Sequence, residues 1–132
     1  MIIENKKRDD ILEGESRIAF AVNTEGWNVT GFAKKISKKY WPELANMEKC
    51  ELGTVLTKTI DSKTFFALVC YSLEKGWDDQ TEIIKKCFDS IETNEPIASA
   101  YIGKDFLCKL SGSNLRQIKE GIELSEKKII FY

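Results

Sequence analysis

The sequence predicts an α/β fold: a three-layer α/β/α sandwich with a mixed, mostly parallel sheet, formed by residues 1–132 as a single domain. Short apolar strands alternate along the chain with amphipathic helices, which favours parallel strands with helices on both faces of the sheet. Two consecutive strands are separated by a short turn, which predicts one antiparallel hairpin. With 132 residues, the chain is long enough for one hydrophobic core and too short for two.

The first third of the chain contains two predicted strands and one predicted helix. The strands cover Met1–Asn5 and Ile18–Val22, which are short apolar segments. The helix covers Thr30–Tyr40, and Pro42 follows it at a point where a helix is expected to stop. We therefore expect a strand that leads through a polar loop into a helix.

The middle of the chain predicts the hairpin and a second helix. The strands Thr54–Thr59 and Thr64–Cys70 flank the turn Ile60–Lys63. The second helix covers Asp78–Glu92, with Asp78 or Asp79 as its N-cap. One face of this helix carries apolar residues at helical spacing: Ile83, Ile84, Cys87, Phe88 and Ile91.

The last third of the chain predicts a strand at Ile97–Ile102, a helix at Ser113–Leu124 and a strand at Lys128–Tyr132. Ser111 or Ser113 is the expected N-cap of this helix. In a mostly parallel sheet, ligands bind beyond the carboxyl ends of the strands. That edge is expected to gather four segments: residues 9–11, 23–31 and 103–113, and the end of the chain.

The composition gives no overall attraction to a polyanion. Lys and Arg number 20 and Asp and Glu 21, so the net charge is −1, and net charge favours neither nucleic acid nor an anionic membrane as a partner. No apolar run approaches the roughly 20 residues of a membrane-spanning helix. The first ten residues lack the apolar segment of a signal peptide. We expect a cytoplasmic monomer that binds neither membranes nor specific nucleic-acid sequences.

The cysteine pattern argues against a metal site. Cys50, Cys70, Cys87 and Cys108 are widely spaced, with no CxxC pair, and the chain has no histidine. We therefore expect no metal and no cofactor. The lack of histidine also excludes Ser-His and Cys-His catalytic pairs. Cys70 and Cys87 lie on apolar faces and are expected in the core.

The segment Arg17–Tyr40 has the features of an anion-binding site. Its apolar strand ends at Asn23, whose side-chain amide can bind a sugar hydroxyl. The helix that follows begins at a Thr30–Gly31 step, where unsatisfied N–H groups and the helix dipole favour an anion. Gly31 allows close approach of a ligand to the backbone. The alternative is an ordinary strand–loop–helix connection in which Thr30 is only an N-cap.

Four segments of the chain together resemble the macro domain family, which binds ADP-ribose. RDDIL is similar to the family's Gly-Asp-Ile element, SAYIGKDF to the strand that carries Ile-Gly into a second ligand loop, and KKIIFY to the final strand. IAFAVNTEGWNVTGFAKKI resembles the strand and phosphate loop, with Gly31, Phe32 and Ala33 matching Gly-Ile-Ala. The likeness is greatest to the compact branch that includes ADP-ribose-1''-phosphate phosphatase-like and terminal ADP-ribose glycohydrolase-like proteins.

The resemblance implies roles for individual residues. Asp10 binds the adenine amino group with Ile11 beside it, and Phe131 or Tyr132 lies over the adenine ring. Asn23 orients the distal ribose and, with Asp105 as a base, contributes to catalysis. Two loops bind the diphosphate and the distal ribose: Val29, Thr30, Gly31 and Phe32 in the first, and Ile102, Gly103, Lys104, Ser111, Gly112 and Ser113 in the second. The alternative for residues 111–114 is a simple helix N-cap.

The implied ligand is ADP-ribose or ADP-ribose-1''-phosphate, or an ADP-ribosylated macromolecule. A hydrolase would cleave ADP-ribose-1''-phosphate or remove ADP-ribose from modified protein or nucleic acid. Two departures from the family pattern favour a binding-only reader or sequestering module: Val29 replaces the first glycine of Met-Gly-x-Gly, and Tyr71–Ser72 replaces a lysine of one hydrolytic subgroup, with Lys75 displaced nearby. A third possibility is a fold relative that serves in protein–protein contact.

Aromatic and basic residues near the expected site have two interpretations each. Trp27 and Trp77 lie in predicted loops, where each is either a partly buried anchor or a cover for a ligand. Trp41 is expected to pack where the first helix ends. Four lysines are expected to form a solvated helix face, with a secondary attraction for a diphosphate as the alternative: Lys34, Lys35, Lys38 and Lys39.

Overall fold

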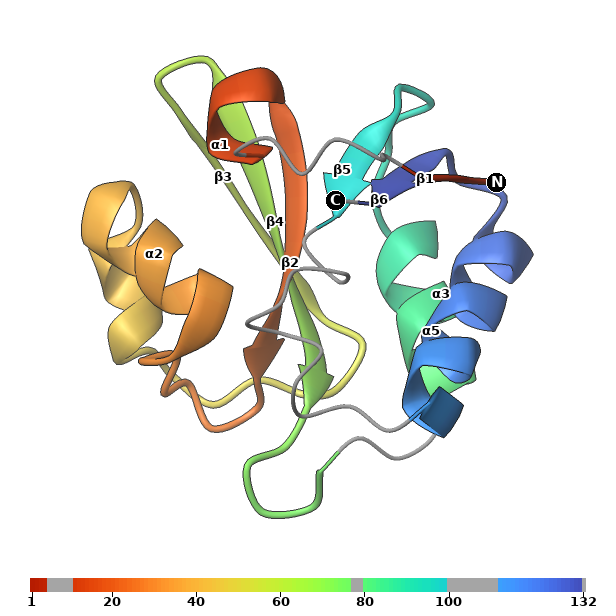
Figure 1. Cartoon of the computed structure of the whole chain (residues 1–132). Helices are drawn as coiled ribbons and strands as arrows, with labels where there is room; N and C mark the ends of the chain where they lie inside the picture. Colours follow the sequence, from red (N-terminus) through yellow and green to blue (C-terminus); the bar gives the residue numbers. More distant parts are fainter. Residues whose placement is uncertain (5–10, 77–79, 100–111, 132) are drawn as a thin grey trace.

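The computed structural model describes residues 1–4, 11–76, 80–99 and 112–131, and for residues 4 and 112–115 the backbone alone. Its centre is a six-stranded sheet in the order β1-β6-β5-β2-β4-β3 (Figure 1). Strand β3 pairs antiparallel with β4, and the other neighbouring pairs are parallel. The mixed, mostly parallel sheet is therefore confirmed. The strands are β1 (Ile2–Glu4), β2 (Arg17–Asn23), β3 (Val55–Ile60), β4 (Lys63–Tyr71), β5 (Ile97–Ser99) and β6 (Ile129–Phe131).

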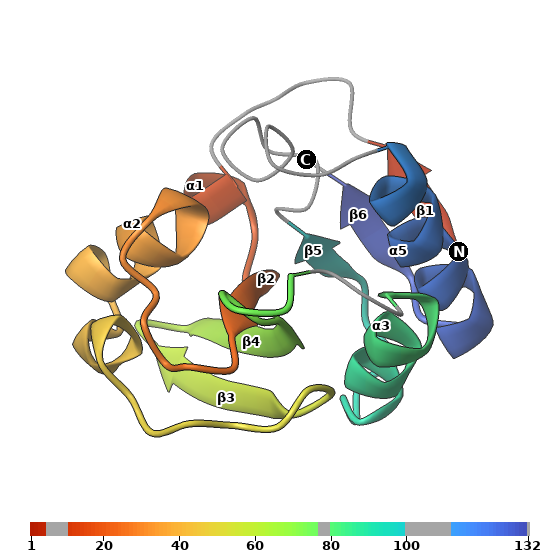
Figure 2. The same cartoon turned by 90° about the horizontal axis from the view of Figure 1, so that it is seen from below.

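Helices cover both faces of the sheet, so the predicted three layers are confirmed. One face is covered by α1 (Ile11–Gly14), α2 (Gly31–Lys39) and the 3₁₀ helix η1 (Pro42–Ala45). The other face is covered by α3 (Gln80–Asp89) and α5 (Gly112–Ser125). Figure 2 shows these two groups of helices on either side of the strands.

Alternate residues of the central strands fill two separate cores. In β4, Phe65, Ala67 and Val69 face α2, whereas Phe66, Leu68 and Cys70 face α3 and α5. This alternation is the two-residue period of a strand. Because both faces are covered, β2 and β4 are near-continuous apolar runs. The predicted core positions of Cys70 and Cys87 are confirmed, since both side chains are fully buried.

The element boundaries differ from the prediction in a few places. The hairpin turn consists of Asp61 and Ser62 alone, both with positive φ (51° and 65°), so β3 and β4 each extend further than expected. Helix α3 ends at Asp89 rather than Glu92. Helix α5 already includes Gly112, so Ser113 lies inside it and is not its N-cap. The predicted caps Asp78, Asp79 and Ser111 lie outside the described residues.

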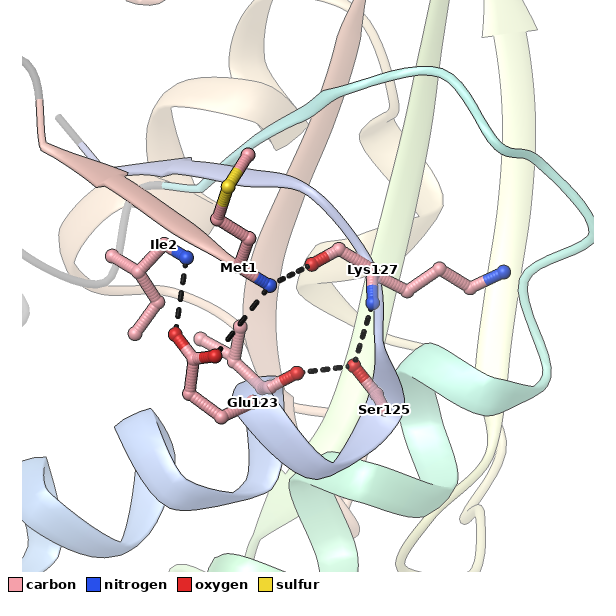
Figure 3. Close-up of polar contacts among 6 residues, drawn as sticks. Met1, Ile2, Glu123, Ser125 and Lys127 are labelled. Carbon is pink, nitrogen blue, oxygen red and sulfur yellow. Dashed lines mark hydrogen bonds and ion pairs between the residues drawn. The ribbon is translucent and has the colours of Figure 1, made fainter.

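The start of β1 is held by the end of α5 (Figure 3). The Glu123 carboxylate accepts a hydrogen bond of 3.1 Å from the Ile2 N–H and lies 3.7 Å from the Met1 amino group. The Met1 amino group also donates to the Lys127 carbonyl oxygen at 2.7 Å. These contacts fix β1 beside β6, with which it pairs in parallel.

Candidate functional site

The candidate site lies at the carboxyl edge of the sheet, where β2 and β4 end. Val22 pairs with Val69 and Asn23 with Tyr71, so the register shifts by one residue at this edge. The loop that leads from β2 to α2 begins here, at the end of β2 opposite to α1 (Figure 1). Ligands of open α/β sheets bind at such an edge.

The side-chain amide of Asn23 organises the β2–α2 loop from a buried position. Its Oδ1 accepts a hydrogen bond from the Trp27 N–H at 3.0 Å, and its Nδ2 donates to the Trp27 carbonyl oxygen at 2.6 Å. The Asn23 side chain is 1% exposed. Because its amide is used inside the loop, the predicted contact with a distal ribose stays a prediction.

A second asparagine ties this loop to the segment that follows α2. Asn28 Oδ1 accepts from the Asn23 N–H at 3.0 Å, and Asn28 Nδ2 donates to the Leu44 carbonyl oxygen at 2.9 Å. The Met47 N–H donates to the Gly26 carbonyl oxygen at 3.0 Å. The loop is therefore fixed from two sides, by β2 and by the residues around η1.

Trp41 and Trp27 lie in different environments. Trp41 packs edge-on against Phe20, with ring centroids 6.5 Å apart, as expected for the end of α2. Trp27, in contrast, is 63% exposed, so it is not the partly buried anchor that was one of its two interpretations. Trp77 lies outside the described residues.

The N-terminus of α2 presents a row of backbone donors. Within the described part of the chain, the N–H groups of the five residues 29–33 have no hydrogen-bond partner. Thr30 occupies the N-cap position, but its side chain makes no capping hydrogen bond. Gly31 has a φ of 61°, a conformation that glycine adopts without strain. Free N–H groups at the positive end of a helix dipole favour an anion.

The side chains of Val29 and Thr30 at this N-terminus are exposed, whereas Ala33 is buried. The Val29 side chain, which stands where the family pattern has a glycine, is 52% exposed. The predicted solvated face of α2 is confirmed, since its four lysines are exposed: Lys34, Lys35, Lys38 and Lys39. Their positive charges add to the potential that favours an anion at this edge.

A carboxylate joins the β2–α2 loop to the turn that follows β4. Glu25 Oε1 accepts hydrogen bonds from the Leu73 N–H and the Thr24 hydroxyl, both at 2.9 Å. Glu25 Oε2 accepts from the Ser72 hydroxyl at 2.8 Å and the Glu74 N–H at 3.4 Å. The bond from Leu73, together with those from Ser72 and Thr24, lowers the pKa of the Glu25 carboxyl to about 2, against an opposing effect of burial.

Tyr71 is the last residue of β4 and lies beside Asn23 at the same edge of the sheet. Burial raises the pKa of its phenol, and a hydrogen bond with the Asn23 side chain opposes part of that rise. The phenol therefore stays protonated at neutral pH. Where the resemblance implies a lysine in one hydrolytic subgroup, this chain has the partly buried Tyr71 and Ser72, whose hydroxyl donates to Glu25.

The structure corrects two predicted ligand contacts. Ile11 is 6% exposed in the core beneath α2, and α1 lies by the start of β2 whereas Asn23 ends it (Figure 1). The structure therefore does not bring Ile11 to the β2–α2 loop. Phe131 is 1% exposed in the core under α5, with Lys119 Nζ 5.9 Å from its ring centroid, so its ring is not available to cover an adenine.

Several predicted site residues cannot be placed from the structure. Gly112 and Ser113 form the first turn of α5, whose backbone alone is described. The remaining predicted residues lie outside the described residues: Asp10, Ile102, Gly103, Lys104, Asp105, Ser111 and Tyr132. Their roles stay predictions.

Sequence reasoning missed Glu25, Gly26, Asn28 and Ser72. Gly26 has a φ of 83°, and a Cβ built there would lie 2.1 Å from the Met47 carbonyl oxygen. The TEGWN segment did contain a signal, because a glycine in a short loop between a strand and a helix indicates a turn. The partners of Glu25 in the turn after β4 lie 47 to 49 residues away in the sequence, and no local pattern indicates them.

Two surface grooves of the described chain lie away from the β2–α2 loop. These grooves, of about 690 and 500 Å³, run along α3 and β3, and neither is lined by a residue of that loop. No group of three or more His, Cys, Asp or Glu among the described residues could hold a metal ion. No described helix is long and apolar enough to cross a membrane.

Comparison with solved structures identifies the fold. The macrodomain of Mycobacterium tuberculosis DarG matches with a TM-score of 0.69 and 15% identity, over 100% of this chain and 97% of that one. This chain has the macrodomain fold. The macrodomain of Thermus aquaticus DarG matches with a TM-score of 0.61 and 15% identity, over 99% and 96% of the two chains.

A structure titled "Alphavirus P23pro-zbd" also matches this chain, with a TM-score of 0.69 and 15% identity. The match covers 100% of this chain, which spans 22% of the length of that protein. No protein-family profile matches the sequence, and no curated protein is significantly similar to it. The resemblance to macro domains is therefore confirmed at the level of the fold.

We predict that Gly26→Ala destabilises this protein far more than Gly76→Ala. Both glycines have φ near 80°, so alanine costs roughly 1 to 2 kcal/mol of backbone strain at either position. At Gly76 a Cβ meets nothing within 4 Å, whereas at Gly26 it meets the Met47 backbone. Overpacking adds roughly 1 to 3 kcal/mol there. Equal losses in urea unfolding of the two variants would contradict the described loop.

We also predict an acid-dependent loss of stability that depends on Glu25. Its folded-state pKa of about 2 lies below the ordinary value of 4.5, so its stabilisation is complete above pH 4.5 and is lost as the pH falls toward 2. Wild type should lose more unfolding free energy than Glu25→Gln between about pH 5.5 and about pH 2.5. Glu51→Gln, at an exposed carboxylate, is the control and should follow wild type. Parallel curves for wild type and Glu25→Gln would contradict the assignment.

Proposed function

We propose that this macrodomain binds ADP-ribose, or a phosphorylated or macromolecule-linked form of it, at the carboxyl edge of its sheet. The observation that carries the proposal is the row of N–H groups in residues 29–33 without a partner in the described part of the chain. The macrodomain fold places this row at the edge where open α/β sheets bind ligands. A diphosphate is a ligand that such a row of donors suits.

The chemistry of a diphosphate fits the row in three respects. Its oxygens are strong acceptors, and backbone N–H groups cost nothing to orient once the loop is rigid. The α2 dipole and the four lysines of α2 supply positive potential for its negative charge. Gly31, with a φ of 61°, carries no Cβ that would keep the ligand from the backbone.

The remaining ligand contacts are proposed from the resemblance to macro domains. Asp10 binds the adenine amino group, and the loop around Gly103 holds the other side of the diphosphate. Asn23 acts on the distal ribose through the loop residues that its amide holds in place. The ribose and adenine distinguish ADP-ribose from a simple diphosphate.

A hydrolytic reaction is the first of two functional alternatives. The substrate would be ADP-ribose-1''-phosphate, or protein or nucleic acid that carries ADP-ribose. A water held against the bound diphosphate would give a proton to Asp105 and attack C1'' of the distal ribose. The bond from C1'' to the phosphate, protein or nucleic acid would break, and the leaving group would take up a proton. Positioning and charge stabilisation would supply most of the rate enhancement.

Binding without turnover is the second alternative, and an observation at β4 favours it. The lysine of one hydrolytic subgroup is replaced here by Tyr71, whose phenol stays protonated, and by Ser72, whose hydroxyl binds Glu25. Neither group supplies an ammonium ion. A reader or sequestering module would keep the diphosphate site and lack this chemistry.

We predict that calorimetric titration with ADP-ribose gives a dissociation constant in about the micromolar range, with weaker binding of AMP and NAD. Asp10→Ala should abolish the binding. Gly31→Ala should weaken it, because a residue with a Cβ resists the left-handed conformation that presents the row of N–H groups. Turnover assays on ADP-ribose-1''-phosphate then separate the two alternatives.

The control for Gly31→Ala is Gly53→Ala. Gly53 has a φ of 91°, and the three atoms nearest to an added Cβ belong to the flexible side chain of Lys86 in α3. Gly53→Ala therefore introduces similar backbone strain away from the proposed site and should leave the affinity for ADP-ribose unchanged. Absence of heat and of any thermal shift with the wild-type protein would refute the ADP-ribose proposal.

A further inference from the structure

The hydrogen bonds that join the two loops at the site run through one side chain. The last backbone contact between them is from the Thr24 N–H to the Tyr71 carbonyl oxygen, at 3.0 Å. Beyond it, within the described residues, the hydrogen bonds between residues 25–31 and 72–76 all end on the Glu25 carboxylate. The spacing of the two loops therefore depends on this carboxylate.

The turn that Glu25 holds is a rigid unit. Ser72 and Gly76 exchange two backbone hydrogen bonds, of 3.0 and 2.7 Å. The Ser72 hydroxyl accepts from the N–H groups of Glu74 and Lys75, at 3.2 and 3.0 Å, while it donates to Glu25. A displacement of Glu25 would thus move the turn as a whole.

The loop that carries Glu25 is rigid as well. Glu25 lies between Asn23 and Trp27 in the chain. The Asn23 amide binds the Trp27 carbonyl oxygen at 2.6 Å and the Trp27 N–H at 3.0 Å. The same loop continues into the row of N–H groups in residues 29–33. Glu25 therefore couples two rigid units, the β2–α2 loop that carries the N–H groups of residues 29–33 and the turn 72–76 that follows β4.

We infer that Glu25 is a positioning residue that sets the turn 72–76 against the phosphate-binding loop and thereby determines the affinity for the diphosphate ligand. This inference rests on the proposed function. Glu25 does not touch the ligand in this scheme. Its carboxylate satisfies donors of the turn, and the geometry of the site follows from that contact.

Because Glu25 is negatively charged, the direction in which Glu25→Gln changes the affinity distinguishes a positioning role from simple charge repulsion. A carboxylate near a diphosphate repels it, so neutralising Glu25 would strengthen binding if electrostatics alone mattered. Removal of the loop contact would weaken binding, since a glutamine amide cannot accept from both the Leu73 and Glu74 N–H groups as the two carboxylate oxygens do. A purely stabilising role would leave the affinity of the folded protein unchanged.

The test is a calorimetric titration of Glu25→Gln with ADP-ribose, beside wild type and the control Glu51→Gln. We expect Glu25→Gln to bind about tenfold more weakly at a temperature where it is fully folded. Glu51→Gln should bind like wild type. Hydrogen exchange without ligand should show faster exchange of the Leu73 and Glu74 amides in Glu25→Gln.

A second variant keeps the test valid if Glu25→Gln folds poorly. Ser72→Ala removes one of the four donors and should also weaken binding, with less than additive effect when combined with Glu25→Gln. Equal or tighter binding by Glu25→Gln or Ser72→Ala, with wild type binding normally, would overturn the inference and leave the proposed function intact. Absence of binding by wild type would overturn the proposed function, and with it this inference.

Discussion

The buried amide of Asn23 is the constraint on which the candidate site depends. A side chain that both accepts from and donates to the backbone of Trp27 fixes a loop that would otherwise be free to move at the end of β2. Asn23 itself is buried, which limits the competition of water for these hydrogen bonds. This anchor acts together with the contacts of Asn28 and Met47 and with the packing of α2 on the sheet.

The rigid loop explains why polar groups can stay available beside it. Asn23, Glu25 and Asn28 accept hydrogen bonds from backbone donors of the surrounding loops. The N–H groups of residues 29–33 have no partner within the described residues. The charged groups are arranged accordingly. The carboxylate of Glu25 is directed at the turn after β4, whereas the lysines of α2 supply the positive potential.

The layers of the fold could be predicted because the buried strands and amphipathic helices carry strong local patterns. The four-residue elements α1 and η1 are too short to show such a pattern. Strand order is invisible in the sequence: β6 lies between β1 and β5, which buries Phe131 that was expected over an adenine. The start of a helix at Thr30–Gly31 could be predicted from the local sequence, but the hydrogen bond from Leu73 to Glu25 is long-range and could not.

The most direct test of the account follows backbone amides by NMR during titration with ADP-ribose. The account predicts the largest chemical-shift changes at the N–H groups of residues 29–33. It predicts little change along the larger surface groove beside α3, for example at Leu52 and Ile83. Shifts concentrated in that groove, or no saturable change at residues 29–33, would contradict the claim that the α2 N-terminus binds the diphosphate.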